Sequence, residues 1–146
     1  MALIALNTPA TEGSYLTRTA ARIAPSRRWQ GRILTGAGLL LLPWLGYLAG
    51  TLPPAEAAAW VSLDALEAAC LLATGTRLLR GDARYRAPAA AAAVLLLADA
   101  CIDMATAAPG TELATAIAMA IGAELPLAAL CGTLAARPAK SAHTAR

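Results

Sequence analysis

Charged side chains are scarce in this sequence of 146 residues. Asp, Glu, Lys and Arg make up only 14% of it, whereas a soluble domain usually carries about 25%. Aromatic residues amount to 4%, with no Phe, and a single His is present. The chain also lacks the low hydrophobicity of a disordered protein and the many cysteines of a small disulfide-linked domain. These absences argue against a water-soluble globule and exclude the disordered and disulfide-linked classes.

Apolar residues dominate instead, at 58% of the chain with a mean hydropathy of +0.57. Four apolar segments stand out, at residues 33–52, 57–79, 88–108 and 111–136. A helix rises about 1.5 Å per residue, so each segment can cross a hydrocarbon core of about 30 Å. The sequence therefore predicts an all-α integral membrane protein with a four-transmembrane-helix bundle at residues 33–136.

Basic residues lie on only one side of these predicted spans. All twelve Lys and Arg occur before residue 33, between 77 and 86, or after 136, and the two opposite loops contain none. Basic loops stay in the cytoplasm by the positive-inside rule. We therefore expect a multi-pass protein of the cytoplasmic (inner) membrane with both termini cytoplasmic, a basic arm at 1–32 and a tail at 137–146.

The basic arm has two interpretations. Residues 15–30 combine Arg with apolar side chains and can lie on anionic headgroups, or the arm is disordered and only fixes the topology. The net charge of +3 does not indicate nucleic-acid binding, because the basic residues sit where membrane insertion needs them. The expected partner is the lipid bilayer, and no nucleic acid is expected.

Five of the nine acidic residues fall inside the predicted spans, namely Asp64, Glu67, Asp99, Asp103 and Glu124. A charged residue at the centre of a bilayer costs about 3 kcal/mol on insertion scales. Residues 64 and 67, and likewise 99 and 103, are spaced so that each pair projects from one helix face. By helix rise, all five lie in the outer half to the middle of the bilayer. We expect these faces to turn inward, because lipid cannot solvate them.

These acids have no basic partner within their spans. The nearest Arg beyond Glu67, Arg77, is about 15 Å away along the helix axis. The carboxyl groups must then be protonated, hydrated, hydrogen-bonded to one another or bound to a cation. A neutral acid can donate a proton to a substrate while a neighbouring carboxylate accepts one. All five are therefore candidate catalytic residues, with Asp99 and Glu67 as donor and acceptor and the other three orienting them.

A structural alternative for the acids is that they join helices through hydrogen bonds, which average about 0.6 kcal/mol in membranes. Three aromatic residues, Trp44, Tyr47 and Trp60, are candidates for substrate binding at the level of the acids. An interfacial aromatic belt and lipid-facing packing are the alternatives for them.

Small residues and a proline mark other features of the predicted spans. Gly46 and Gly50 form a small-xxx-small pair, which predicts close helix packing. Pro126 removes a helical hydrogen bond and frees the carbonyl of Gly122, which predicts a kink next to Glu124.

Cofactor motifs are absent from the sequence. It has no phosphate-binding glycine loop, no dinucleotide fingerprint and no Ser/His/Asp set, and no His lies in any predicted span. We therefore predict no cofactor and no metal. An oxygen-ligand site for a hard divalent ion is the alternative left open.

Two stretches, WVSLDALE at 60–67 and DACIDMAT at 99–106, resemble those of small four-span membrane proteins of actinobacterial type. The resemblance covers the last three predicted helices. It implies the four-span fold and no particular activity.

The leading functional hypothesis is acid–base chemistry, such as isomerisation or cyclisation, on a lipophilic small molecule without a cofactor. The first alternative is a proton-coupled exporter of lipophilic cations, in which the acids bind either a proton or the substrate. The second is a structural subunit whose acidic faces dock on a basic partner helix. A homo-oligomer is compatible with each of them.

Overall fold

The computed structural model describes residues 25–137, and these residues form helices without any strand. The elements are α1 (Pro25–Thr51), α2 (Pro54–Arg80), the short 3-10 helix η1 (Ala83–Tyr85), α3 (Arg86–Thr106), α4 (Thr111–Met119), the π-helical turn η2 (Ala120–Glu124) and α5 (Leu125–Ala136). The last three follow one another without a break. Four helical runs are thus long and apolar enough to cross a membrane, as the sequence predicts. The predicted arm before residue 25 and the tail after residue 137 lie outside the described residues.

Helix α1 begins earlier than the apolar segment predicted to start at residue 33. It starts at Pro25, and its first turns carry Arg27, Arg28 and Arg32. Proline is favoured at a first helical position, because its missing N–H would have no partner there. Hydropathy shows where a helix can lie in hydrocarbon, but the backbone becomes helical before that point.

The turn between α2 and α3 reverses the chain tightly. Gly81 adopts a left-handed conformation with φ 71°, which glycine adopts without steric cost. The N–H of Asp82 donates to the carbonyl of Arg77 over 2.9 Å, and the Asp82 carboxylate accepts from the N–H of Arg84 over 2.9 Å. This helix-ending motif brings α3 back antiparallel to α2.

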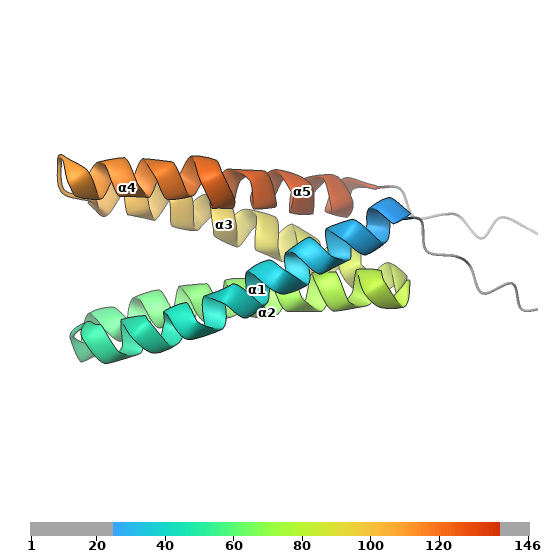
Figure 1. Cartoon of the computed structure of the whole chain (residues 1–146), viewed down its shortest axis with the longest axis horizontal. Helices are drawn as coiled ribbons and strands as arrows, with labels where there is room; N and C mark the ends of the chain where they lie inside the picture. Colours follow the sequence, from blue (N-terminus) through green and yellow to red (C-terminus); the bar gives the residue numbers. More distant parts are fainter. Residues whose placement is uncertain (1–24, 138–146) are drawn as a thin grey trace, which may run out of the picture.

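The helical runs form two antiparallel pairs (Figure 1). Helix α1 packs along α2, and α3 packs along the run formed by α4, η2 and α5, while α2 and α3 connect the two pairs. The pairs converge where α1 begins and α5 ends, and they diverge toward the opposite turns (Figure 1). We call these the closed end and the open end, the latter containing the turns at 52–53 and 107–110.

Glycines set the close approach of α1 and α2. A Cβ atom on Gly38 would lie 2.8 Å from Cγ of Leu72 and 3.1 Å from the carbonyl oxygen of Ala68. A Cβ atom on Gly75 would lie 2.7 Å from the carbonyl oxygen of Gly31. All three distances are shorter than ordinary contacts, so only glycine allows this packing.

The predicted close packing at Gly46 and Gly50 is wrong within the described chain. Both glycines face open space, with no heavy atom within 4 Å of an added Cβ. A small residue permits a close contact, but the partner helix decides where the contact forms. Here the small residues of α2 meet α1 nearer its beginning, opposite Gly31 and Gly38.

An apolar core fills the closed end. All four helical runs contribute buried side chains to it, chiefly Leu34, Leu71, Leu78, Tyr85, Leu96, Cys131 and Leu134. Arginines add contacts around this core. Nε of Arg86 donates to the carbonyl of Ala135 over 3.1 Å, and Nη1 of Arg137 donates to Gln30 over 3.4 Å. The closed end is therefore held together by both apolar packing and polar contacts.

Candidate functional site

A cavity of about 970 Å³ lies between the two helix pairs. Toward the closed end, the cavity is bounded by Leu71 and Leu96, which belong to the apolar core there. Its other boundary reaches Leu52, Ala107 and Glu112 at the open end. The cavity thus extends from the middle of the helices to the open end, and all four helical runs line it.

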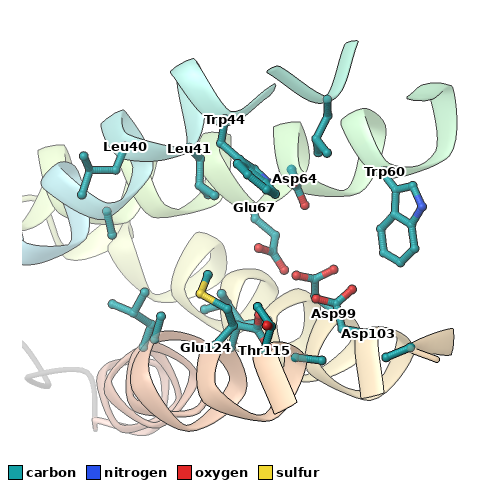
Figure 2. Close-up of a pocket in the computed structure, with 18 of the residues that line it drawn as sticks. Leu40, Leu41, Trp44, Trp60, Asp64, Glu67, Asp99, Asp103, Thr115 and Glu124 are labelled. Atoms are coloured by element: carbon teal, nitrogen blue, oxygen red, sulfur yellow. The ribbon is translucent and has the colours of Figure 1, made fainter. Parts of the chain in front are cut away.

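All five acids predicted as site residues line this cavity. Four of them are buried, namely Asp64, Glu67, Asp99 and Glu124, and Asp103 is half-buried. Glu67 is the most enclosed, with 2% of its surface exposed. Figure 2 shows Glu67 extending from α2 toward Asp99 and Asp103 of α3. The convergence that the sequence spacing predicts is therefore present.

Helical periodicity explains why the acids face inward. On α2 the acids at 64 and 67 continue the buried stripe formed by Leu71, Thr74 and Leu78. On α3 the acid at 99 continues the stripe formed by Ala92 and Leu96. Residues three and four apart share one helix face. Packing of the apolar part of each stripe at the closed end therefore turns the acidic part toward the other pair.

Glu124 is positioned by an irregular turn. The N–H of Leu125 bonds to the carbonyl of Ala120, five residues earlier, so η2 is wider than a regular α-helical turn. Pro126 follows directly and has no N–H to offer Gly122. Where the sequence predicts a kink next to Glu124, the structure has a π-helical turn, and Glu124 at its end is buried.

The carboxylate oxygens gather in two groups that share one residue. One oxygen from each of Asp64, Glu67 and Asp99 lies within 4.8 Å of the other two. The same holds for Asp99, Asp103 and Glu124. We call these the α2–α3 triad and the α3–η2 triad. Asp99 connects them, so the five carboxyl groups form one continuous cluster across the cavity.

Three oxygens in this cluster have no hydrogen-bond partner, although they are fully buried. They are Oε1 of Glu67, Oδ1 of Asp99 and Oε2 of Glu124. Within residues 25–137, no Lys, Arg or His lines the cavity. Burying an ionised carboxylate without a partner costs several kcal/mol. The cluster is therefore suited to hold protons or a bound cation.

Not all of the three aromatic residues predicted to bind substrate line the cavity. Trp44 and Trp60 line the cavity, but Tyr47 does not. The Trp44 indole lies beside the Asp64 side chain (Figure 2). Tyr47 stacks against Trp44 with ring centroids 5.4 Å apart, and it is 58% exposed. Its contact with the site is therefore made through Trp44.

Sequence reasoning missed the α4 side of the cavity. Glu112, Thr115 and Met119 line it near the open end. Glu112 also accepts a hydrogen bond from the N–H of Ala108 over 3.2 Å at the start of α4. The signal for this face is the spacing of 112, 115, 119 and 123, which repeats every three or four residues.

The chain was compared with protein-family models, with curated proteins and with solved structures, and nothing matched. The resemblance to small four-span proteins of actinobacterial type stays an expectation.

Proposed function

We propose that this chain is a multi-pass membrane protein whose carboxylate cluster performs acid–base chemistry on a lipophilic small molecule. Isomerisation and cyclisation are the reaction types that fit best. Both need a proton donor and a proton acceptor and no redox cofactor.

The distribution of charge supports the orientation in the membrane. The arginines of the described chain all lie toward the closed end, at positions 27, 28, 32, 77, 80, 84, 86 and 137. By the positive-inside rule this end faces the cytoplasm. The open end contains the turns next to Glu56 and Glu112 and has no basic residue. The cavity then opens toward the outer side of the cytoplasmic membrane.

One observation carries the proposal: three buried carboxyl groups present unpartnered oxygens at a cavity large enough for an organic molecule. Ligand cavities commonly measure about 300–1,000 Å³, and this one is about 970 Å³. Glu67 and Asp99 come from opposite helix pairs, and their oxygens approach within 4.8 Å. One can give a proton to a substrate carbon while the other removes a proton from a second carbon. Transfer between the two carboxyl groups then restores the starting state.

The cavity walls support a lipophilic substrate. Leu40, Leu41 and Leu48 of α1 and Leu127 of α5 line the cavity together with the ring of Trp60. The carboxylate cluster lies between the two helix pairs, with Asp64 and Glu67 on one side and Asp99, Asp103 and Glu124 on the other (Figure 2). An apolar molecule can therefore pack against these apolar side chains while one part of it contacts the acids. Asp64, Asp103 and Glu124 are assigned to orienting the donor and acceptor.

A second candidate function is proton-coupled export of a lipophilic cation, which the divergence of the two helix pairs favours. The two helix pairs pack together through the apolar core at the closed end and diverge toward the open end (Figure 1). The acids line the cavity that lies between the diverging parts. Rocking of one pair against the other is a common transport motion. The acids would then bind either protons or the cation.

Deuterium incorporation distinguishes the two functions. The purified protein is placed in liposomes containing a mixture of isoprenoid polyenes in D₂O, and mass spectrometry measures deuterium bound to carbon. We expect incorporation by the wild type and a loss of about 100-fold or more in Glu67→Gln and Asp99→Asn, the scale of general acid–base catalysis. Glu56→Gln is the matched control, because Glu56 is exposed and does not line the cavity.

The same liposomes, loaded with ethidium under an imposed pH gradient, test export. Gradient-dependent ethidium flux without deuterium incorporation identifies an exporter and contradicts the enzyme. Retention of full incorporation in both amide variants also contradicts the assignment of Glu67 and Asp99.

A further inference from the structure

The α3–η2 triad has the composition of a cation site. We propose that Asp99, Asp103 and Glu124 bind a hard divalent cation, and that Ca²⁺ is the ion that fits best. The three oxygens that would ligate it already lie within 4.8 Å of one another. This inference goes beyond the proposed reaction, because cation binding and proton transfer can each be present without the other.

Buried oxygens without partners favour a bound ion over simple hydrogen bonding between helices. Asp99 is 8% exposed and Glu124 is 7% exposed, and each has one oxygen without a hydrogen-bond partner. Carboxyl groups that served as helix–helix glue would have these oxygens paired. Glu67, which carries a third unpartnered oxygen, approaches the shared residue Asp99 from the opposite helix pair. The residues whose buried carboxylate oxygens lack a hydrogen-bond partner are therefore grouped around Asp99.

The charge and chemistry of the triad favour a hard divalent ion. Three ionised carboxylates carry a charge of −3, so a divalent ion leaves −1 whereas a monovalent ion leaves −2. Every ligand is an oxygen atom, which suits Ca²⁺, Mg²⁺ and Mn²⁺ better than the ions that prefer sulfur or imidazole. In the described chain no basic residue lines the cavity to compete for these carboxylates.

The spacing of the oxygens favours the larger ion. Two oxygens on one ion cannot lie farther apart than twice the metal–oxygen distance, which is about 4.2 Å for Mg²⁺ and about 5 Å for Ca²⁺. The oxygens of the triad lie within 4.8 Å of one another, so bringing all three to one ion needs less inward movement at the Ca–O distance of about 2.3–2.6 Å than at the Mg–O distance of about 2.0–2.1 Å. Ca²⁺ also takes six to eight oxygens. Bidentate carboxylates and water from the cavity can supply them, because Asp103 is only half-buried.

The α3–η2 triad is preferred over the α2–α3 triad because an ion can reach it. Asp103 is half-buried and lines the cavity, whereas all three members of the other triad are buried. Asp64 in that other triad also has the Trp44 indole beside it. With the ion bound, Asp99 serves as a ligand and is not free to exchange protons with Glu67, so the proposed reaction takes place when the triad is free of the ion.

Calorimetric titration with CaCl₂ tests the inference on the full chain in a neutral detergent. We expect one Ca²⁺ per chain with a dissociation constant of about 10⁻⁴ M, as in other accessible weak calcium sites, and weaker binding of Mg²⁺. Asp103→Asn and Glu124→Gln should each lower the affinity at least tenfold. Asp64→Asn, which removes a carboxylate of the other triad, should lower the affinity less than either of these. Glu112→Gln and Glu56→Gln are matched controls, since they remove carboxylates outside both triads, and each should stay within threefold of the wild type.

Thermal unfolding with and without Ca²⁺ gives a second readout and shows that each variant folds. Ca²⁺ should raise the unfolding temperature of the wild type and of the two control variants but not of Asp103→Asn, which keeps the test valid even if Glu124→Gln fails to fold. Absence of Ca²⁺ binding to the wild type at millimolar concentration overturns the inference. Binding that depends on Asp64 but not on Asp103 or Glu124 overturns it as well. Deuterium incorporation that persists without added Ca²⁺ leaves the proposed reaction standing in either case.

Discussion

Glu67 is the most enclosed acid of the carboxylate cluster. Its side chain is almost fully enclosed, yet one carboxylate oxygen has no hydrogen-bond partner. A residue chosen for stability would not leave a buried oxygen unpaired, because this costs about 1–3 kcal/mol. Side chains kept against stability are typical of functional sites.

Glu67→Gln should therefore unfold at the same temperature as the wild type or a few degrees higher. The amide has nearly the same shape, carries no charge, and its NH₂ group can donate to the nearby carboxylates. Tryptophan fluorescence during heating in detergent measures this. Leu71→Asn, one turn further along the same face and fully buried, is the contrasting variant and should lose about 2–5 kcal/mol of core packing. A comparable drop in both variants would identify Glu67 as helix–helix glue.

At the scale of elements, the closest contact in the fold is that of α1 with α2. A Cβ atom added to Gly75 would meet Thr35 and the carbonyl oxygen of Gly31 at less than contact distance. Any added side-chain atom must push the two helices apart. Overpacking of this kind costs about 1–3 kcal/mol.

Gly75→Ala is expected to lower the unfolding free energy by this amount, although alanine is the better helix former. Gly46→Ala is the control, because its Cβ meets open space. It should raise the stability by about 0.5–1 kcal/mol through helix propensity alone. Equal behaviour of the two variants in thermal unfolding would contradict the close contact at Gly75.

The sequence predicts the number and approximate extent of these elements because the apolar segments are long and clearly separated. It also predicts that the acids converge, since spacing by three and four residues fixes a helix face. It does not predict which faces of α1 and α2 meet, as the open space at Gly46 shows. It also does not predict the π-helical turn, because a proline indicates an irregularity in the helix but not whether this is a kink or a wider turn. These features depend on tertiary packing.

The whole molecule has an uneven distribution of charge. Within residues 25–137, the arginines lie toward the closed end, and the charged residues of the cavity and of the open end are all acids. If the chain spans a membrane as proposed, this difference between its ends determines which one faces the cytoplasm.

Cysteine labelling of intact cells tests that orientation. In a background without the three natural cysteines, Ala55→Cys in the turn region between α1 and α2 should react with an impermeant maleimide. Asp82→Cys, between α2 and α3, should react only after the cells are permeabilised. The reverse pattern would invert the topology, and labelling of both sites in intact cells would exclude a membrane-spanning α2.

The two helix pairs also have a consequence for how the protein is made. If the chain spans a membrane as proposed, α1 and α2 are synthesised first, and Asp64 and Glu67 enter the bilayer before the acids of α3 and η2. The five carboxyl groups come together only when the second helix pair packs against the first, which it does through the apolar core of the closed end. Docking of the two pairs, rather than insertion of any one helix, is then the step that creates the site.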